Sequence, residues 1–209
     1  MLIGFIGRIG SGKTTAADFL VENYEFSKHN FKDALDNELF ELYPNVLDRL
    51  AAFSEHSKTA EELISEKPTP LYIRELKQKH GTEVRRSQDE GYWVKKWIET
   101  YLQTFNGNVC VDDVRFMNEV DTIKRFRGII VRIERTDEQE ESQHVSETEL
   151  DGFEADYTIT ADPGDLMTIQ MALEDIVVKR DDIGSREEDG DDSSSYAEYA
   201  EEAGTEGSE

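Results

Sequence analysis

The chain has 209 residues, which is enough for one domain of ordinary size with a terminal extension. Its 47 Asp and Glu residues against 23 Lys and Arg give a net charge of −24, which argues against direct binding to nucleic acid, because such binding needs a basic face. A single cysteine, Cys110, excludes an internal disulfide and predicts a cytoplasmic location, and no apolar run approaches the ~18 residues that a membrane span needs.

The first element is a short apolar segment at residues 2–6. Because it is apolar on both faces, it predicts a buried parallel strand, and it lacks the basic start of a signal peptide. A helix over residues 12–23 follows it directly. The segment between them is therefore a turn that joins a strand to a helix.

That turn carries a phosphate-binding motif, G-x-x-x-x-G-K-[ST]. Glycines let successive backbone N–H groups point at one anion, the lysine reaches the β- and γ-phosphates of a nucleoside triphosphate, and the Thr14 hydroxyl ligates Mg²⁺. The alternative is a glycine-rich turn that only packs a helix on a sheet, which has no need of the Lys-Thr pair. The predicted ATP-binding residues are Gly7, Arg8, Ile9, Gly10, Ser11, Gly12, Lys13, Thr14 and Thr15.

A long helical stretch comes next, after a weaker strand near residues 26–29. Helices are predicted at 31–42, 59–66, 70–80 and 89–105, and residues 31–105 are interpreted as an insertion that builds a substrate lobe. Arg74 and Gln78 share one face of the third helix, which Gly81 is expected to close. Gln can read a base edge and Arg can bind a phosphate, although such a pair can also be plain solvated surface.

A second apolar strand, residues 108–114, ends in carboxylates. Asp113 and Arg115 are two apart and are expected to point the same way, with Asp112 opposite. A strand-end Asp beside the phosphate loop can orient the metal, and Arg115 can bind phosphate. The alternative is that Asp113 caps a helix and Arg115 is its salt-bridge partner.

The remaining elements complete a parallel sheet. Strands are predicted at 128–133 and 156–160, with helices at 118–126 and 163–179, the latter capped by Asp162 with Pro163 at its first position. Strands that alternate with helices predict an α/β fold, a parallel sheet of about five strands flanked by helices. Residues 134–152 form a candidate lid, and with it Arg132 or Arg135 is a candidate to engage phosphate; the alternative is a loop of solvated charges.

The C-terminal segment differs from the rest in composition. Residues 181–209 hold twelve Asp or Glu residues against one base, Arg186, with no apolar periodicity. Such a segment cannot bury enough surface to offset its chain entropy, so we expect a folded unit over residues 1–180 followed by a disordered acidic tail. A DNA mimic that docks on a basic partner is a further interpretation of the tail.

The motifs together resemble the bacteriophage-type deoxynucleoside monophosphate kinases. The phosphate loop is followed by Arg74, Gln78, Gly81 and Thr82 with Trp93, then by Asp113-Val114-Arg115-Phe116-Met117-Asn118-Glu119, and then by His144-Val145-Ser146-Glu147. The resemblance implies a P-loop kinase that uses ATP and Mg²⁺, in the host cytoplasm if the chain is viral. It implies catalysis by Lys13, Asp113 and Arg115. It also implies a deoxynucleoside monophosphate held by Arg74, Gln78, Gly81, Thr82, Trp93, Asp113, Arg115 and Glu119.

Two other functions remain open from the sequence. One is a P-loop kinase for another small acceptor, such as dephospho-coenzyme A. The other is a nucleotide-dependent ATPase or regulator, which needs only water as its second substrate. The accepted base and the oligomeric state stay open as well, with a homodimer as one candidate.

Overall fold

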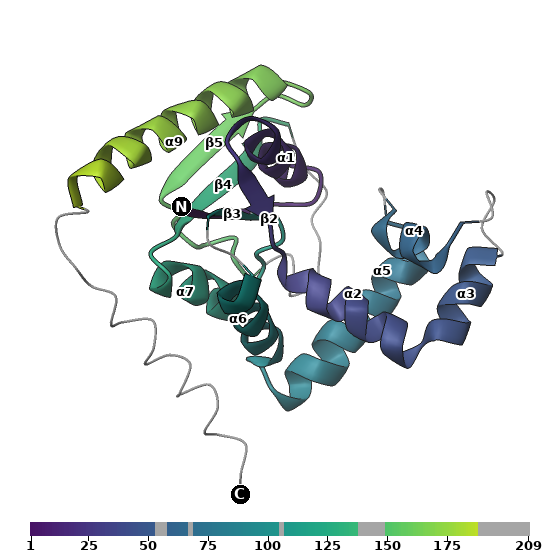
Figure 1. Ribbon diagram of the computed structural model, residues 1–209. Coiled ribbons are helices and arrows are strands. Elements are labelled where there is room, and N and C mark those ends of the chain that lie inside the picture. Colours follow the sequence, from purple (N-terminus) through teal and green to yellow (C-terminus); the bar gives the residue numbers. More distant parts are fainter. Residues whose placement is uncertain (53–57, 67–68, 105–106, 138–148, 188–209) are drawn as a thin grey trace, which may run out of the picture.

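A computed structural model describes residues 1–52, 58–66, 69–104, 107–137 and 149–187 (Figure 1). Five strands form one sheet in the order β2-β3-β1-β4-β5, and every pairing is parallel. The α/β fold with about five parallel strands is thus confirmed. The strands are β1 (Leu2–Ile6), β2 (Phe26–Lys28), β3 (Asn108–Val111), β4 (Ile129–Arg135) and β5 (Tyr157–Ala161).

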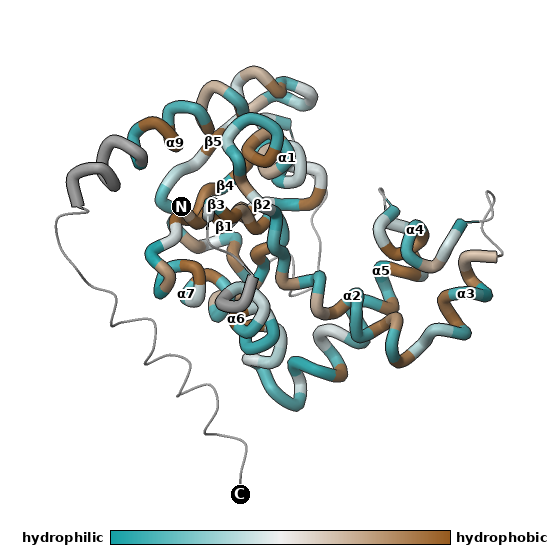
Figure 2. Tube along the Cα trace, in the orientation of Figure 1, coloured by the Kyte–Doolittle hydropathy of each residue, from teal (hydrophilic) through white to brown (hydrophobic). Residues whose placement is uncertain are grey.

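The sheet separates two apolar cores. Helices α1 (Lys13–Asn23) and α9 (Leu166–Glu187) lie over one face, and α6 (Tyr92–Thr104) and α7 (Met117–Arg125) lie over the other (Figure 1). Figure 2 shows hydrophobic residues concentrated in the strands between these helices. Because both faces are covered, the central strand β1 is buried at every residue, which explains its uninterrupted apolar sequence.

A helical lobe is inserted between β2 and β3, and Figure 1 shows it projecting beyond the sheet. The lobe has its own apolar core, with Leu39, Leu47 and Ile73 fully buried. The helical character predicted for the insertion is confirmed in its described part. The lobe comprises α2 (Phe31–Leu42), α3 (Pro44–Ala52), α4 (Ala60–Ser65), α5 (Leu71–Gln78) and a π-helix (Lys79–Arg86).

Two details of the lobe differ from the sequence-based expectation. Helix α3 was not predicted, since its sequence starts on a proline directly after another helix and its burial depends on neighbours within the lobe. Gly81 does not close the preceding helix, because the chain continues as the π-helix. A Cβ on Gly81 would lie 3.2 Å from Leu35 Cδ2, so the glycine serves close packing against α2.

The start of the last helix also differs. Helix α9 begins at Leu166 and not at Pro163, because residues 162–165 form a turn in which the Asp165 N–H donates to the Asp162 carbonyl at 2.9 Å. The Asp165 side chain then accepts the Thr168 N–H at 3.1 Å, so Asp165 replaces Asp162 as the capping residue. At its other end α9 continues to Glu187, past the expected boundary at residue 180, and residues 188–209 of the predicted tail lie outside the described part.

The lobe is fastened to the sheet where α2 begins. The Trp97 indole N–H donates to the His29 carbonyl at 3.0 Å, and a His29 ring nitrogen lies 3.2 Å from the Trp97 carbonyl. The Trp97 ring also stacks on Phe31, with ring centroids 5.1 Å apart. Helix α6, which leads out of the lobe, therefore packs on the segment by which the chain enters it.

The two faces of α9 give a matched test of this packing. Leu173 is fully buried in the core, whereas Met171 is 63% exposed on the same helix. We expect Leu173→Ala to lower the free energy of unfolding by about 2–5 kcal/mol, because it leaves a cavity. Met171→Ala should change it by about 0.5 kcal/mol or less. Urea unfolding of both variants measures the difference, and equal losses would contradict the placement of α9.

Candidate functional site

The loop between β1 and α1 has the geometry of an anion-binding nest. Gly7, Gly10 and Gly12 have φ angles of 133°, 75° and 107°, values that side-chain-bearing residues rarely adopt. A Cβ on Gly7 would lie 2.2 Å from the Ile133 carbonyl oxygen, so the loop can pass β4 only with glycine there. The loop ends at the N-terminus of α1, where unpaired N–H groups and the helix dipole favour an anion.

Side chains of the loop are placed to receive a phosphate group. The Lys13 ammonium donates to the carbonyls of Gly7 and Arg8 at 2.5 and 2.8 Å, so it folds back over the nest. The Ser11 hydroxyl is buried and has no hydrogen-bond partner within the described part of the chain. A buried donor without a partner is unfavourable unless a ligand satisfies it, and the loop therefore fits the triphosphate of a nucleotide. Ile9, Gly10 and Thr14 are exposed, and Gly12 and Thr15 are partly buried.

A cavity opens beside this loop. Arg8 closes one side of it through a salt bridge of 3.2 Å to Asp151. The Arg132 guanidinium donates to the carbonyls of Leu150 and Phe153, both at 2.7 Å, and so holds the turn that carries Asp151. The lining residues are Gly7, Arg8, Ile9, Lys13, Val114, Arg115, Arg132, Leu150 and Asp151.

The candidate lid is described only at its ends. Arg135 lies in β4, where it pairs with Asp137 and donates to the Gly10 carbonyl at 3.4 Å. Arg132 lines the cavity, so both candidate arginines lie next to the phosphate loop. Residues 138–148, and with them the motif at residues 144–147, lie outside the described part. Closure of a lid therefore stays a prediction.

The end of β3 differs from the expectation. The strand stops at Val111, so strand alternation does not set the directions of the next side chains. Asp113 is buried and accepts the backbone N–H groups of Phe31 and Lys32 at 3.1 and 2.8 Å. Burial raises the pKa of this carboxyl group. The structure thus places Asp113 at the start of α2 and Arg115 at the cavity, and does not bring the two to one face.

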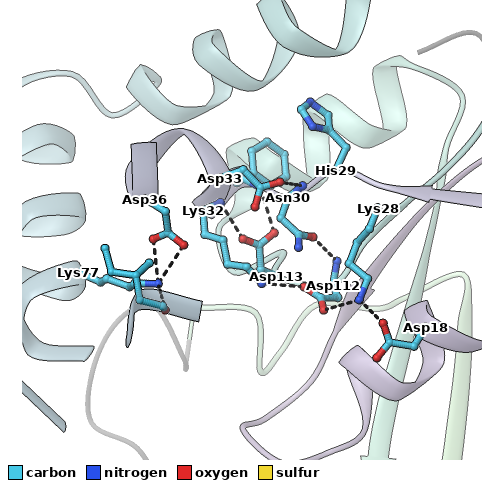
Figure 3. A network of polar contacts seen from close by, with 12 residues as sticks. Asp18, Lys28, His29, Asn30, Lys32, Asp33, Asp36, Lys77, Asp112 and Asp113 are labelled. Carbon is cyan, nitrogen blue, oxygen red and sulfur yellow. Dashed lines mark hydrogen bonds and ion pairs between the residues drawn. The ribbon is translucent and has the colours of Figure 1, made fainter. Parts of the chain in front are cut away.

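Asp112 lies closer to the phosphate loop than Asp113 does. The Lys32 and Lys28 ammonium groups lie 3.1 and 3.7 Å from its carboxylate (Figure 3), and the Thr14 hydroxyl is near enough to help lower its pKa. Burial would raise its pKa, but these two lysines hold the pKa below its usual value. Sequence reasoning missed Asp112 and Lys32. The sequence does contain a signal for Asp112, namely two consecutive aspartates directly after an apolar strand. Because that strand pairs with β1, one of the two aspartates is expected to face the phosphate loop.

The predicted acceptor-binding residues divide into two groups. Arg74 and Gln78 are partly buried, one turn apart on α5, and Thr82 is partly buried in the π-helix. Trp93 is only 4% exposed, and its indole N–H donates to the Gly81 carbonyl at 3.0 Å. Gly81 and Trp93 therefore pack the lobe against itself.

Glu119 holds the segment that carries Arg115. Its carboxylate accepts the N–H groups of Arg115 and Phe116 at 2.7 and 3.1 Å, and it forms a buried ion pair with Arg86. The Arg86 guanidinium also lies 3.6 Å from the centre of the Phe116 ring. Burial raises the pKa of Glu119 to about 7. Glu119 thus positions Arg115 and connects α7 to the π-helix of the lobe.

Two further properties of the described residues bear on the site. Within them, no group of three or more His, Cys, Asp or Glu side chains is arranged to hold a metal ion. A metal at this site would therefore need oxygen atoms of a bound nucleotide as well. Among the helices that the structure describes, none is long and apolar enough to cross a membrane.

A parallel five-stranded sheet with a phosphate-binding loop between β1 and α1 defines a P-loop kinase fold. The chain belongs to the deoxynucleotide monophosphate kinase family, whose model matches residues 45–171. A protein of Acanthamoeba polyphaga mimivirus, which is named as an inferred deoxynucleotide monophosphate kinase, is 32% identical to this chain over 162 residues. The matched residues cover 72% of this chain and 82% of that protein. The family indicated by the sequence motifs is thereby confirmed.

Solved structures of low sequence identity also resemble the chain. The crystal structure of TT1252 from Thermus thermophilus is 17% identical and has a TM-score of 0.48, over 86% of this chain and 97% of that one. Shikimate kinase from Acinetobacter baumannii, in complex with shikimate, is 13% identical with a TM-score of 0.45, over 86% of this chain and 93% of that one.

The buried pair of Arg86 and Glu119 is tested by breaking it. Their side chains are 8% and 3% exposed, so Arg86→Met leaves a buried carboxylate without its cation. We expect a loss of about 3–5 kcal/mol in the free energy of unfolding at pH 8, and a smaller loss when Glu119→Gln is added. Because the raised pKa of Glu119 lies above its unfolded value, the loss should shrink as the pH falls and the carboxyl group becomes protonated in the folded state.

Urea unfolding at pH 5 and pH 8 measures these losses. A single variant that is no less stable than the double variant, or a loss independent of pH, would contradict a charged and paired Glu119.

Proposed function

We propose that this protein transfers the γ-phosphate of ATP to a deoxynucleoside monophosphate, giving ADP and the deoxynucleoside diphosphate. The observation that carries the proposal is the phosphate nest, whose buried Ser11 hydroxyl has no partner among the described residues, in a chain of the deoxynucleotide monophosphate kinase family. The bond from the γ-phosphorus to the bridging oxygen breaks, and an oxygen of the acceptor phosphate forms the new bond. That oxygen is already anionic, so no general base is required.

The donor side of the site would be formed by the phosphate loop. Backbone N–H groups of the nest and the Ser11 hydroxyl would bind phosphate oxygens, and Lys13 would exchange its two carbonyl partners for the β- and γ-phosphates. The Thr14 hydroxyl and the nearby Asp112 carboxylate would hold Mg²⁺. A bound Mg²⁺ neutralises the charge that builds up on the transferring phosphoryl group.

The acceptor side would lie between the cavity and the lobe. Arg115 lines the cavity and would bind the acceptor phosphate, while Arg74 and Gln78 on α5 would contact the nucleotide farther out. Asp113 and Glu119 would act indirectly, because their carboxylates hold the start of α2 and the backbone of Arg115. Catalysis would then depend on positioning and charge neutralisation.

The proposed reaction is tested by the acceptor requirement. We expect ATP consumption with Mg²⁺ to depend on one or more of dAMP, dGMP, dCMP, dTMP and dUMP, with the matching diphosphate detected by chromatography. Lys13→Ala should reduce turnover by about 100-fold or more, since a preorganised phosphate contact is lost. Lys95→Ala, which removes a half-exposed lysine on α6, is the control and should be unchanged. Equal ATP hydrolysis with and without every acceptor would identify an ATPase, or a kinase for another acceptor.

The role of Gln78 is tested by the ranking of acceptors. If its amide reads the base, Gln78→Ala should lower kcat/KM by about 10-fold or more for the preferred acceptor and much less for the others. The affinity for ATP should stay the same, because α5 lies in the lobe. Competition among the five monophosphates in one reaction measures this, and an unchanged ranking would show that Gln78 does not read the base.

A further inference from the structure

Lys32 is held at both of its ends by the two carboxylates that follow β3. Its backbone N–H donates to Asp113 at 2.8 Å, and its ammonium group donates to Asp112 at 3.1 Å (Figure 3). Lys32 lies in the first turn of α2, the helix by which the chain enters the lobe. A cation is therefore fixed between the phosphate loop and the lobe, although no sequence motif pointed to it.

The Asp112 carboxylate bridges two parts of the site. On one side it lies near the Thr14 hydroxyl, and on the other it accepts a hydrogen bond from the Lys32 ammonium group, with only 3% of its own side chain exposed. Lys28 lies 3.7 Å from the other carboxylate oxygen, but its ammonium group is hydrogen-bonded to Asp18 on α1. Of these two lysines, only Lys32 belongs to the helix that leads into the lobe.

A metal ion at Thr14 and Asp112 would compete with Lys32. The ion would add further positive charge to a buried carboxylate that already has two lysines beside it, and these charges repel strongly because little water is present to screen them. The Lys32 side chain is 32% exposed and has a flexible stem, so its ammonium group can leave Asp112. Its backbone would stay in place, because Asp113 holds the N–H independently of the side chain.

We propose that Lys32 is a catalytic cation, which Asp112 holds until Mg²⁺ takes over that carboxylate and which then binds the phosphate of the acceptor. This inference rests on the proposed function. The ammonium group would approach from the start of α2 and Arg115 from the cavity, so that two cations contact the acceptor phosphate. The exchange makes binding of the metal and nucleotide a condition for full binding of the acceptor.

The first test follows the Mg²⁺ dependence of ATP binding without any acceptor. Lys32→Met keeps most of the stem and the backbone bond to Asp113 but removes the competing charge. We expect the Mg²⁺ concentration at half-maximal ATP binding to fall by about 3–10-fold, measured by calorimetry on the full chain. A variant that needs the same or more Mg²⁺ would overturn the competition at Asp112.

The second test compares turnover in two lysine variants. Lys32→Met should lower kcat by about 100-fold or more and raise the KM for the monophosphate, with ATP affinity retained. Lys28→Met removes the other lysine beside Asp112 and should keep kcat within about threefold of the wild type. Equal losses in both variants, or a normal kcat in Lys32→Met, would overturn the catalytic role. Circular dichroism and urea unfolding check that both variants are folded.

Failure of the proposed function gives a different result from failure of this inference. A wild-type protein without acceptor-dependent turnover contradicts the function and, with it, the acceptor contact of Lys32. The Mg²⁺ titration of ATP binding still tests the exchange at Asp112 in that case, because it uses no acceptor.

Discussion

Two consecutive carboxylates at the end of β3 fix the relation between the phosphate loop and the helical lobe. Asp113 accepts the first N–H groups of α2, and Asp112 lies between the Thr14 hydroxyl and the Lys32 ammonium group, which donates to it. Because β3 is hydrogen-bonded to β1 up to Val111, the two residues that follow it come next to the strand that leads into the loop. The direction in which the lobe leaves the sheet is therefore set at the point where the candidate metal site lies.

Ion pairs around the site differ in how readily they can be exchanged for a ligand. The pair of Arg8 and Asp151 is 38% and 41% exposed, so it contributes little to stability and can open for a phosphate group. The pair of Arg86 and Glu119 is buried, and losing either partner leaves a charge without compensation. The partly exposed Arg8 is thus available to a ligand, whereas the buried pair of Arg86 and Glu119 serves to position other groups.

The predicted acceptor-binding residues of α5, the π-helix and α6 also differ in how accessible they are. Arg74 and Gln78 remain partly accessible on α5, whereas Gly81 and Trp93 are joined by a hydrogen bond inside the lobe. The π-helix places Arg86 against Glu119, and α6 returns to the sheet through the contacts of Trp97 with His29. The lobe therefore has buried contacts with α7 and with the segment that follows β2.

The sequence alone determined the sheet, the phosphate loop and the helical nature of the insertion, because hydrophobic periodicity and glycine positions depend on local chain geometry. Lys13 and Arg115, which the sequence motifs single out, both line the cavity beside the loop. Only the tertiary structure decided that Asp113 holds the start of α2, that Asp112 pairs with Lys32, and that Trp93 is buried. These features depend on where β3 ends and on which distant segments pack there, and neither is encoded in the spacing of a single motif.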